Sequence, residues 1–158
     1  MSSYLATIHW QRDRQRFTDN KYSRRHFWHF DGGLEIPASA SPREIPTPYS
    51  DSKAVDPEEA YIASISSCHM LWFLSLAARQ EYIVDDYTDR AEGFMQKNED
   101  GFKAITHIIL HPNVIFCKNK AINKQKFDKL HKQAHNMCFI AHSVKTQITV
   151  DATLSIQK

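Results

Sequence analysis

The strongest constraint on this chain is a run of nineteen residues, Ala60 to Ala78, that contains no Asp, Glu, Lys or Arg. Asp56, just before the run, is a good helix N-cap, and Pro57 suits the first helical position. Glu59 stands three residues after Asp56, as a capping box requires. We therefore predict a helix from Asp56 to about residue 79. Because this helix is apolar on nearly every side, we expect it to be buried on nearly every side.

The same run must be compared with a membrane span, which needs about 20 predominantly apolar residues. Four serines, Cys68 and His69 interrupt the apolar character of the run, so we favour a buried helix and predict no membrane partner. The N-terminal segment MSSYLATIHWQRDR lacks the continuous apolar stretch of a signal peptide. We therefore expect a cytoplasmic protein, in which lasting structural disulfides are rare and any disulfide is transient.

The overall composition is that of an ordinary soluble protein. With 158 residues, 42% of them hydrophobic, the chain fits one domain, residues 1–158, with a core that needs no disulfide. The formal net charge of +2 gives no electrostatic reason to expect a nucleic-acid partner.

The sequence before the helix predicts strands and a long loop. Alternating or β-prone residues indicate three strands, over residues 4–10, 27–30 and 34–36. Turn residues at positions 31–33 separate the last two, so we expect these to form a hairpin that ends at Pro37. Three prolines between residues 38 and 55 forbid regular structure and leave an extended segment leading into the helix.

After the helix, the pattern predicts a hairpin, a second helix and a final strand. The hairpin joins residues 91–97 to residues 102–111 and is closed by Pro112, with a short extension over residues 114–116. Apolar residues at helical spacing predict an amphipathic helix from Asn123 to about His142, with Cys138 facing inward. Alternation over residues 148–156 predicts the last strand. The predicted order is β-β-β-α-β-β-α-β, an α+β fold.

Two predicted helices thus each place a cysteine toward the core, and the segments around these cysteines are distinctive. The sequences VDPEEAYIASISSCHM and AHNMCFIAHSVK resemble the OsmC/Ohr family of thiol-dependent peroxidases. The family's Pro-Glu pair, followed ten residues later by a catalytic cysteine, is similar to Pro57, Glu58 and Cys68 here. Its resolving cysteine in a later helix is similar to Cys138. A departure is Phe139, which stands where the family often has proline.

The resemblance implies a fold and an activity. The fold is an intertwined α+β homodimer in which curved antiparallel sheets pack against two central helices. The activity is the reduction of organic hydroperoxides to alcohols, with sites where the subunits meet. Cys68 would be the peroxidatic and Cys138 the resolving cysteine, and a small dithiol or lipoyl-type reductant would return the enzyme to its starting state. No cofactor and no metal are predicted.

A peroxidatic cysteine must be a thiolate, and burial alone would raise its pKa, so a cation has to lie beside it. The resemblance implies an arginine. We favour Arg24, in YSRRHFWHFDGG, since the hydroperoxide-reductase branch has an arginine about this far before an Asp-Gly turn. Arg25 and Arg43 remain alternatives. Glu58 would orient the guanidinium through paired hydrogen bonds.

The spacing of Glu58 and Cys68 raises a geometric question. At about 1.5 Å per helical residue, ten residues put Glu58 roughly 15 Å along the helix from Cys68. Either the start of the helix bends, or Glu58 serves the partner subunit's site. Leu71 and Trp72 follow Cys68 by three and four residues and share its helix face, where they are candidates for an apolar substrate pocket.

Two other interpretations remain open. Four potential zinc ligands fall on one stripe of the second helix: His131, His135, Cys138 and His142. The protein could also be a redox-silent member of the fold that keeps a ligand pocket without the thiol chemistry. His69 points about 100° away from its neighbour Cys68, so we expect it to be a packed, hydrogen-bonded histidine and not a base for that thiol.

Overall fold

The computed structural model describes residues 1–118, 120 and 122–156 and has an α+β fold of nine strands and three helices in that range. The chain divides into two compact units, Met1–Ala60 and Tyr61–Lys158, with the boundary in the first turn of α1 (Pro57–Arg79). That the two units together form a single domain stays a prediction. Each unit is described separately below.

The first unit carries a three-stranded antiparallel sheet in the order β1-β2-β3. Its strands are β1 (Ala6–His9), β2 (His26–Phe30) and β3 (Glu35–Ala38). The predicted hairpin is confirmed: Gly33 adopts a φ of 81° in the turn, and its N–H donates to Phe30 O at 3.0 Å. All residues of β1 are exposed and all of β2 are half-buried, so this sheet has little core of its own.

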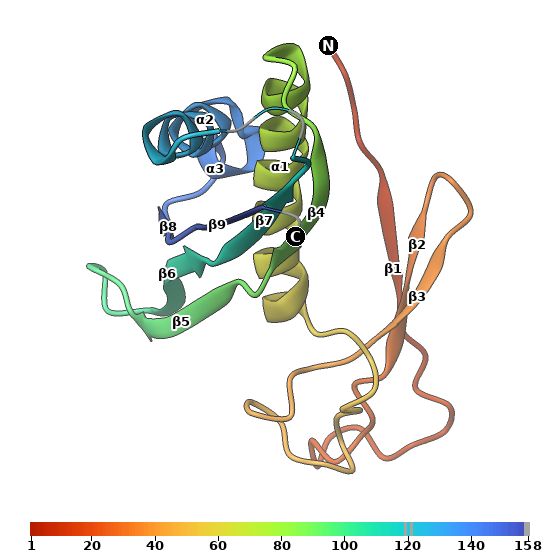
Figure 1. Ribbon diagram of the computed structural model, residues 1–158. Helices are drawn as coiled ribbons and strands as arrows, with labels where there is room; N and C mark the ends of the chain where they lie inside the picture. The colour runs from red at the N-terminus through yellow and green to blue at the C-terminus, as the bar shows by residue number, and fades with distance from the viewer. Residues whose placement is uncertain (119, 121, 157–158) are drawn as a thin grey trace. The chain divides into compact units, whose positions relative to one another are not determined.

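The second unit holds two mixed sheets and the helices (Figure 1). One sheet has the order β4-β7-β9 and the other β5-β6-β8; in each, the first pair of strands is antiparallel and the second pair parallel. The strands are β4 (Val84–Asp89), β5 (Glu92–Lys97), β6 (Lys103–Leu110), β7 (Pro112–Phe116), β8 (Gln147–Val150) and β9 (Thr153–Ile156). The later helices are α2 (Lys124–Met137) and the short α3 (Phe139–His142).

The charge-free helix begins and ends as predicted. Asp56 Oδ1 accepts a hydrogen bond from Glu59 N at 2.7 Å, which satisfies a free N–H of the first turn. Along the helix, Ile65 packs into a cluster with Ile108 and Leu110, and Phe73 packs into a larger cluster built from α1, α2, β7 and their neighbours. Because α1 supplies both clusters, it is the common core element of the second unit.

The expectation that α1 is buried on nearly every side is not met within one chain. One face is buried, whereas Ala63, Ser64, Ser67 and Leu71 are exposed, Leu71 by 61%. By length and composition alone α1 could cross a membrane, and 22% of its most apolar window is buried in the chain. The core helix of a soluble protein passes the same test, and α1 packs into both hydrophobic clusters of the second unit.

Two strand predictions need correction. Strand β4 was not predicted, because a bulge between Val84 and Asp86 interrupts the alternation of inward and outward side chains. The predicted final strand over residues 148–156 is two strands: β8 runs parallel to β6 and β9 runs parallel to β7. The chain changes sheet at Asp151, whose N–H donates to Leu110 O at 2.8 Å.

The predicted helix from Asn123 to His142 is interrupted at Cys138. It starts as expected, since Asn123 Oδ1 accepts from Lys126 N at 2.9 Å. Cys138, however, has extended backbone angles (φ −71°, ψ 109°) and lies between α2 and α3 as the cap of both. The cysteine is therefore presented from a break in the helix and not from a helical face.

Candidate functional site

The two cysteines singled out by the sequence meet in the second unit. Cys68 lies in the middle of α1 and is half-buried, whereas Cys138, in the α2–α3 break, is 1% exposed. Cys68 lies near enough to contribute to the raised pKa of Cys138, and both are free thiols. Two neighbouring free thiols are candidates for a reversible disulfide. Cys117, by comparison, lies beyond the end of β7 and is also free.

The surroundings of Cys138 keep it protonated. Burial, followed by its hydrogen bond to Cys68, raises the pKa of Cys138 to about 11. The Ala141 N–H, which points at Cys138 Sγ from the first turn of α3 at 3.4 Å, acts in the opposite direction but does not prevail. Cys138 is consequently a neutral thiol near pH 7 and a poor nucleophile until its surroundings change.

Apolar side chains flank the cysteine pair. Trp72 packs against the main core cluster and meets Phe139 edge to face, with ring centroids 5.5 Å apart. Phe139 is 68% exposed and Leu71 61% exposed. The residues predicted to line a substrate pocket, Leu71 and Trp72, thus lie on the helix that carries Cys68, and Phe139 joins Trp72 from α3. Exposed apolar side chains of this size are suited to contact an apolar ligand or another subunit.

Glu58 lies in the first turn of α1. Its Oε2 is buried and, within the part of the chain that the structure describes, has no hydrogen-bond partner. Helix α1 continues without interruption from Pro57 past Cys68, so the axial separation of about 15 Å between Glu58 and Cys68 holds. A buried carboxylate oxygen without a donor is costly, and such an atom is a candidate to receive a cation.

The three candidate arginines all belong to the first unit. The Arg24 guanidinium donates to Tyr22 O, to Asn20 O at 2.9 Å and to Asn20 Oδ1 at 2.7 Å, and it stacks over the Tyr22 ring. Arg25 pairs with Asp51 at 2.9 Å. Arg43 is exposed. The first two guanidinium groups are therefore held by their own unit.

A histidine pair that the sequence did not predict lies next to the cysteines. His69, adjacent to Cys68 on α1, is 1% exposed, as the expectation of a packed histidine required. Its Nε2 is 3.0 Å from Nδ1 of His131 on α2, and the two rings are parallel within 3°. Phe73 stacks on His131, with ring centroids 4.2 Å apart. Sequence analysis missed this pair because its members are 62 residues apart and each looks like an isolated core histidine.

Both histidines are neutral near pH 7. Burial lowers the pKa of His69 to about 4, with a smaller contribution from His135. Burial, followed by the nearness of His69, lowers the pKa of His131 to about 3. A neutral pair needs only one proton in its shared hydrogen bond, so the pair fixes α1 to α2 without any buried charge.

The zinc interpretation required four donors on one helical stripe: His131, His135, Cys138 and His142. The structure does not assemble them. The helix ends before Cys138, whose sulfur accepts from Ala141 N, and His142 Nε2 donates to Asn136 O at 2.8 Å. Across residues 1–118, 120 and 122–156, no group of three or more His, Cys, Asp or Glu side chains is placed to hold a metal ion.

A family model for OsmC-like proteins matches residues 50–153, a stretch that contains Cys68, Cys138, α1 and the strands of the second unit up to the start of β9. The chain belongs to the OsmC-like family. This confirms the resemblance drawn from the sequence. An OsmC-like protein of unknown function from Vibrio cholerae has a similar structure, with 48% sequence identity, 96% of this chain and 99% of that chain covered, and a TM-score of 0.95.

Two structures of known resistance proteins share the OsmC-like fold at lower identity. An organic hydroperoxide resistance protein from Elizabethkingia anophelis has 18% identity and a TM-score of 0.69, with 99% of this chain and 98% of that chain covered. The organic hydroperoxide resistance protein OsmC from Legionella pneumophila has 17% identity and a TM-score of 0.67, with 98% of each chain covered. At these identities the similarity shows the fold alone. No curated protein matches the chain.

The histidine pair generates a prediction for stability against pH. Because the pKa of each ring is lower in the folded than in the unfolded state, the unfolded state takes up protons first as the pH falls below about 6.5. Their contribution to stability is therefore complete above that pH and is lost as the pH falls toward 4. When the pH is lowered from 7 to 5, protonation of this pair should decrease the free energy of unfolding by roughly 2 to 4 kcal/mol, as measured by urea denaturation.

The variant His131→Leu should lose a large part of this pH dependence, and His9→Gln, at an exposed position on β1, serves as the matched control. Wild-type protein with equal stability at pH 7 and pH 5 would contradict the prediction.

Proposed function

We propose that this protein is a thiol-dependent peroxidase that reduces organic hydroperoxides to alcohols. The observation that carries the proposal is that two free thiols, Cys68 and Cys138, lie near enough for Cys68 to raise the pKa of Cys138, in a fold shared with organic hydroperoxide resistance proteins. Free buried cysteines are common in proteins, but two that are far apart in sequence and lie near each other in the fold are what a dithiol cycle needs.

Cys68 is the attacking residue in this proposal. It is the more accessible of the two, whereas Cys138 is buried and has a raised pKa. The Cys68 thiolate attacks the terminal oxygen of the hydroperoxide, the O–O bond breaks, and the departing alkoxide takes a proton to become the alcohol. Cys68 is left as a sulfenic acid.

Cys138 completes the cycle. Its sulfur attacks the Cys68 sulfenic acid, the hydroxyl leaves with a proton as water, and a disulfide forms. A small dithiol, by family resemblance a lipoyl-type compound, then reduces this disulfide by thiol exchange and is itself oxidised. The raised pKa of Cys138 would protect this residue from direct oxidation while Cys68 is still reduced. Because Cys138 lies in the break between α2 and α3, its sulfur could move toward Cys68 without unfolding α2.

Glu58 and an arginine would supply the electrostatics. The buried, unpartnered Oε2 of Glu58 is the kind of acceptor that a guanidinium fork satisfies, and the arginine in turn would stabilise the Cys68 thiolate. Arg24 stays our preferred candidate, with Arg25 and Arg43 as alternatives. Since about 15 Å of helix separates Glu58 from Cys68, we propose that Glu58 serves the partner subunit's site.

A homodimer is therefore part of the proposal, and the exposed face of α1 supports it. Ala63, Ser64 and Ser67 are small, exposed and at helical spacing, so a second helix could approach closely along them. Leu71 continues the same face. A second copy would give this apolar helix the cover that its own chain does not provide. A dimer would also bring the apolar flank of Leu71, Trp72 and Phe139 near a subunit boundary, where an organic hydroperoxide can bind.

The alternative is a redox-silent binding protein of the same fold. It would keep the apolar flank and bind organic molecules without turnover. The proximity of the two thiols favours the peroxidase, because ligand binding alone does not require a pair of cysteines.

Replacement of each cysteine should separate the two roles. Cys68→Ser should abolish the consumption of cumene hydroperoxide in the presence of a dithiol, because the nucleophile is lost. Cys138→Ser should react once and then accumulate sulfinic acid at residue 68, visible by mass spectrometry as two added oxygen atoms. Cys117→Ser, outside the pair, is the control and should be as active as wild type. Full activity in Cys68→Ser would reject the mechanism, and an inactive wild type would favour the binding protein.

Dimer formation can be measured by sedimentation. Wild-type protein should behave as a dimer at micromolar concentration, and Ala63→Arg should shift it toward monomer, because a charged side chain would be buried in the middle of the α1 interface. Gln125→Arg, an equally exposed position on α2, should leave the dimer intact. A wild-type protein that sediments as a stable monomer would exclude both the dimer and a shared site.

The proposed location of Glu58 can be tested by mixing subunits. Glu58→Ala and Cys68→Ser homodimers should each have low activity. In a heterodimer with Glu58 acting across the interface, one site has both defects and the other has none, so mixing should restore activity. Subunit exchange is confirmed by intact mass. No recovery after confirmed exchange would mean that Glu58 serves the cysteine of its own chain.

A further inference from the structure

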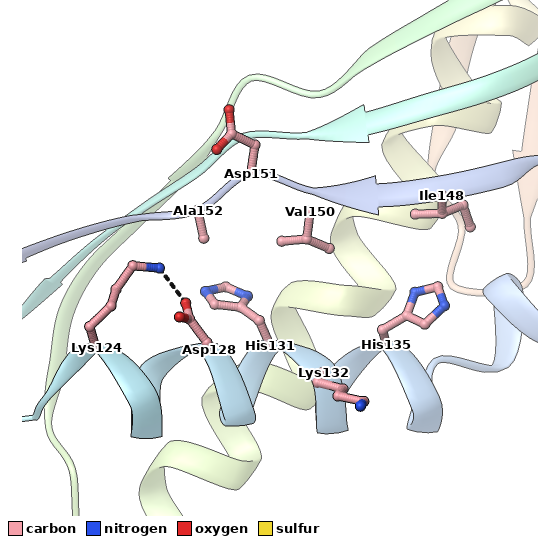
Figure 2. A pocket seen from close by; sticks show the side chains of 9 residues that line it. All are labelled: Lys124, Asp128, His131, Lys132, His135, Ile148, Val150, Asp151 and Ala152. Atoms are coloured by element: carbon pink, nitrogen blue, oxygen red, sulfur yellow. Dashed lines mark hydrogen bonds and ion pairs between the residues drawn. The ribbon is translucent and has the colours of Figure 1, made fainter.

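A second site is suggested by a groove in the Tyr61–Lys158 unit between α2 and the chain that runs through β8 to Ala152. Its volume is about 370 Å³, in the range of small-molecule sites. Figure 2 shows its two walls: Ile148, Val150 and Ala152 lie on the strand side, and His131 and His135 point toward them from α2. Neither Cys68 nor Cys138 lines this groove, so its use is independent of the peroxidase proposal.

His131 is the distinctive group in this groove. It is 4% exposed, its Nδ1 is joined to His69 Nε2, and its Nε2 is buried. Among the described residues, neither His131 Nε2 nor His69 Nδ1 has a hydrogen-bond partner. A buried polar atom of this kind is rare in a folded protein and calls for a partner that the chain does not supply.

The tautomers of the two rings decide whether the missing partner of His131 is a hydrogen-bond acceptor or a donor. Two neutral rings carry two protons, and one of these lies in the hydrogen bond between them. The other is on His69 Nδ1 or on His131 Nε2. On His69 it would be a buried N–H without an acceptor in the core. On His131 it belongs to a side chain that lines the groove, where an oxygen atom of a ligand can accept it. A proton on His131 Nε2 costs less free energy than a proton on His69 Nδ1, so His131 presents a hydrogen-bond donor.

Two lysines and two carboxylates line the groove, so its formal charges balance. Asp128 is paired with Lys124, and Asp151 lies 3.5 Å from His111 Nδ1, an ion pair only when that histidine is protonated. Lys132 has no acidic partner within the part of the chain that the structure describes, and in Figure 2 its side chain points away from the strand side, at the edge of the groove. The strand wall of Ile148, Val150 and Ala152 is apolar, so the site combines the His131 donor with a hydrocarbon surface and a lysine at its edge.

We propose that this groove binds a small organic carboxylate, whose head group accepts a hydrogen bond from His131 Nε2 and whose short apolar tail lies on Ile148, Val150 and Ala152. Because His131 is bonded to His69, the neighbour of Cys68, the ligand would also stabilise the contact that holds α1 against α2.

The test is titration of the purified full-length protein with hexanoate, with hexanol and hexylamine as matched neutral and cationic probes. Hexanoate should bind saturably in the micromolar to millimolar range and shift the imidazole ¹⁵N signals of His131 and the methyl signals of Val150. Hexylamine should not bind. His131→Leu should weaken hexanoate binding on the order of tenfold to a hundredfold, since a hydrogen bond to a charged group is lost. His131→Gln, which keeps an N–H donor, should recover part of this loss.

A second pair of variants avoids the core. Lys132→Glu should weaken binding roughly threefold to tenfold, whereas Lys129→Glu, an exposed lysine on the same helix outside the groove, should have no effect. Equal effects of the two lysine variants, or no saturable hexanoate binding, would overturn the proposal. So would hexanoate shifts confined to Leu71 and Phe139, because the carboxylate would then occupy the cysteine site. Absence of peroxidase activity would not affect this proposal, because hexanoate binding to the groove is measured separately from turnover at the cysteines.

Discussion

The contact on which the second unit depends is the hydrogen bond between His69 and His131. It joins the middle of α1 to the middle of α2 at 3.0 Å, and the stacked Phe73 ring fills the space beside it. Since a helix is a rigid body over such lengths, fixing this point also fixes the residues around it. Cys68 precedes His69 directly, and Cys138 follows His131 by about two turns. Packing of α1 against α2 therefore also places Cys68 near Cys138, just beyond the end of α2.

Burial suppresses the charged form of both kinds of side chain here, and it shifts their pKa values in opposite directions. For the histidines, burial removes charge by lowering their pKa values, so that a polar pair can remain in the core. For Cys138, burial also suppresses the charged form, which here raises the pKa and keeps the thiol unreactive. A nucleophile at Cys68 would need the reverse effect, and burial cannot supply it. A cation has to be brought to Cys68, and this is why the buried carboxylate of Glu58 and an arginine are central to the proposed function.

The two faces of α1 differ in the size of their side chains. Its buried face carries Ile65, Phe73, Leu76 and Ala77, and its exposed face carries small residues and Leu71. Large side chains all along the exposed face would prevent the close approach of a second helix. Apart from Leu71, the large residues named here lie where α2 and the sheets of the same chain meet them. The helix is therefore suited to lie between its own core and another subunit.

Much of this could be predicted from the sequence. The cap at Asp56, the absence of charge from Ala60 to Ala78, the hairpin turn at Gly33 and the cysteine spacing are local properties, set by backbone geometry and side-chain chemistry within a few residues. They were sufficient for the α+β class, the family and the two cysteines. The prediction of His69 as a packed histidine was also local, because it needed only the direction of one side chain on a helix.

Only the tertiary structure decided the rest. The sequence could not show that α2 stops at Met137, because Cys138 fits the helical pattern although its backbone is extended. It could not show that residues 148–156 divide between two sheets, because alternation reports which side is buried and not which neighbour is bound. The partner of His69 lies 62 positions away in the sequence, and the groove beside His131 joins α2 to residues 148–152. Such contacts depend on how helices and sheets pack, and no local pattern in the chain records them.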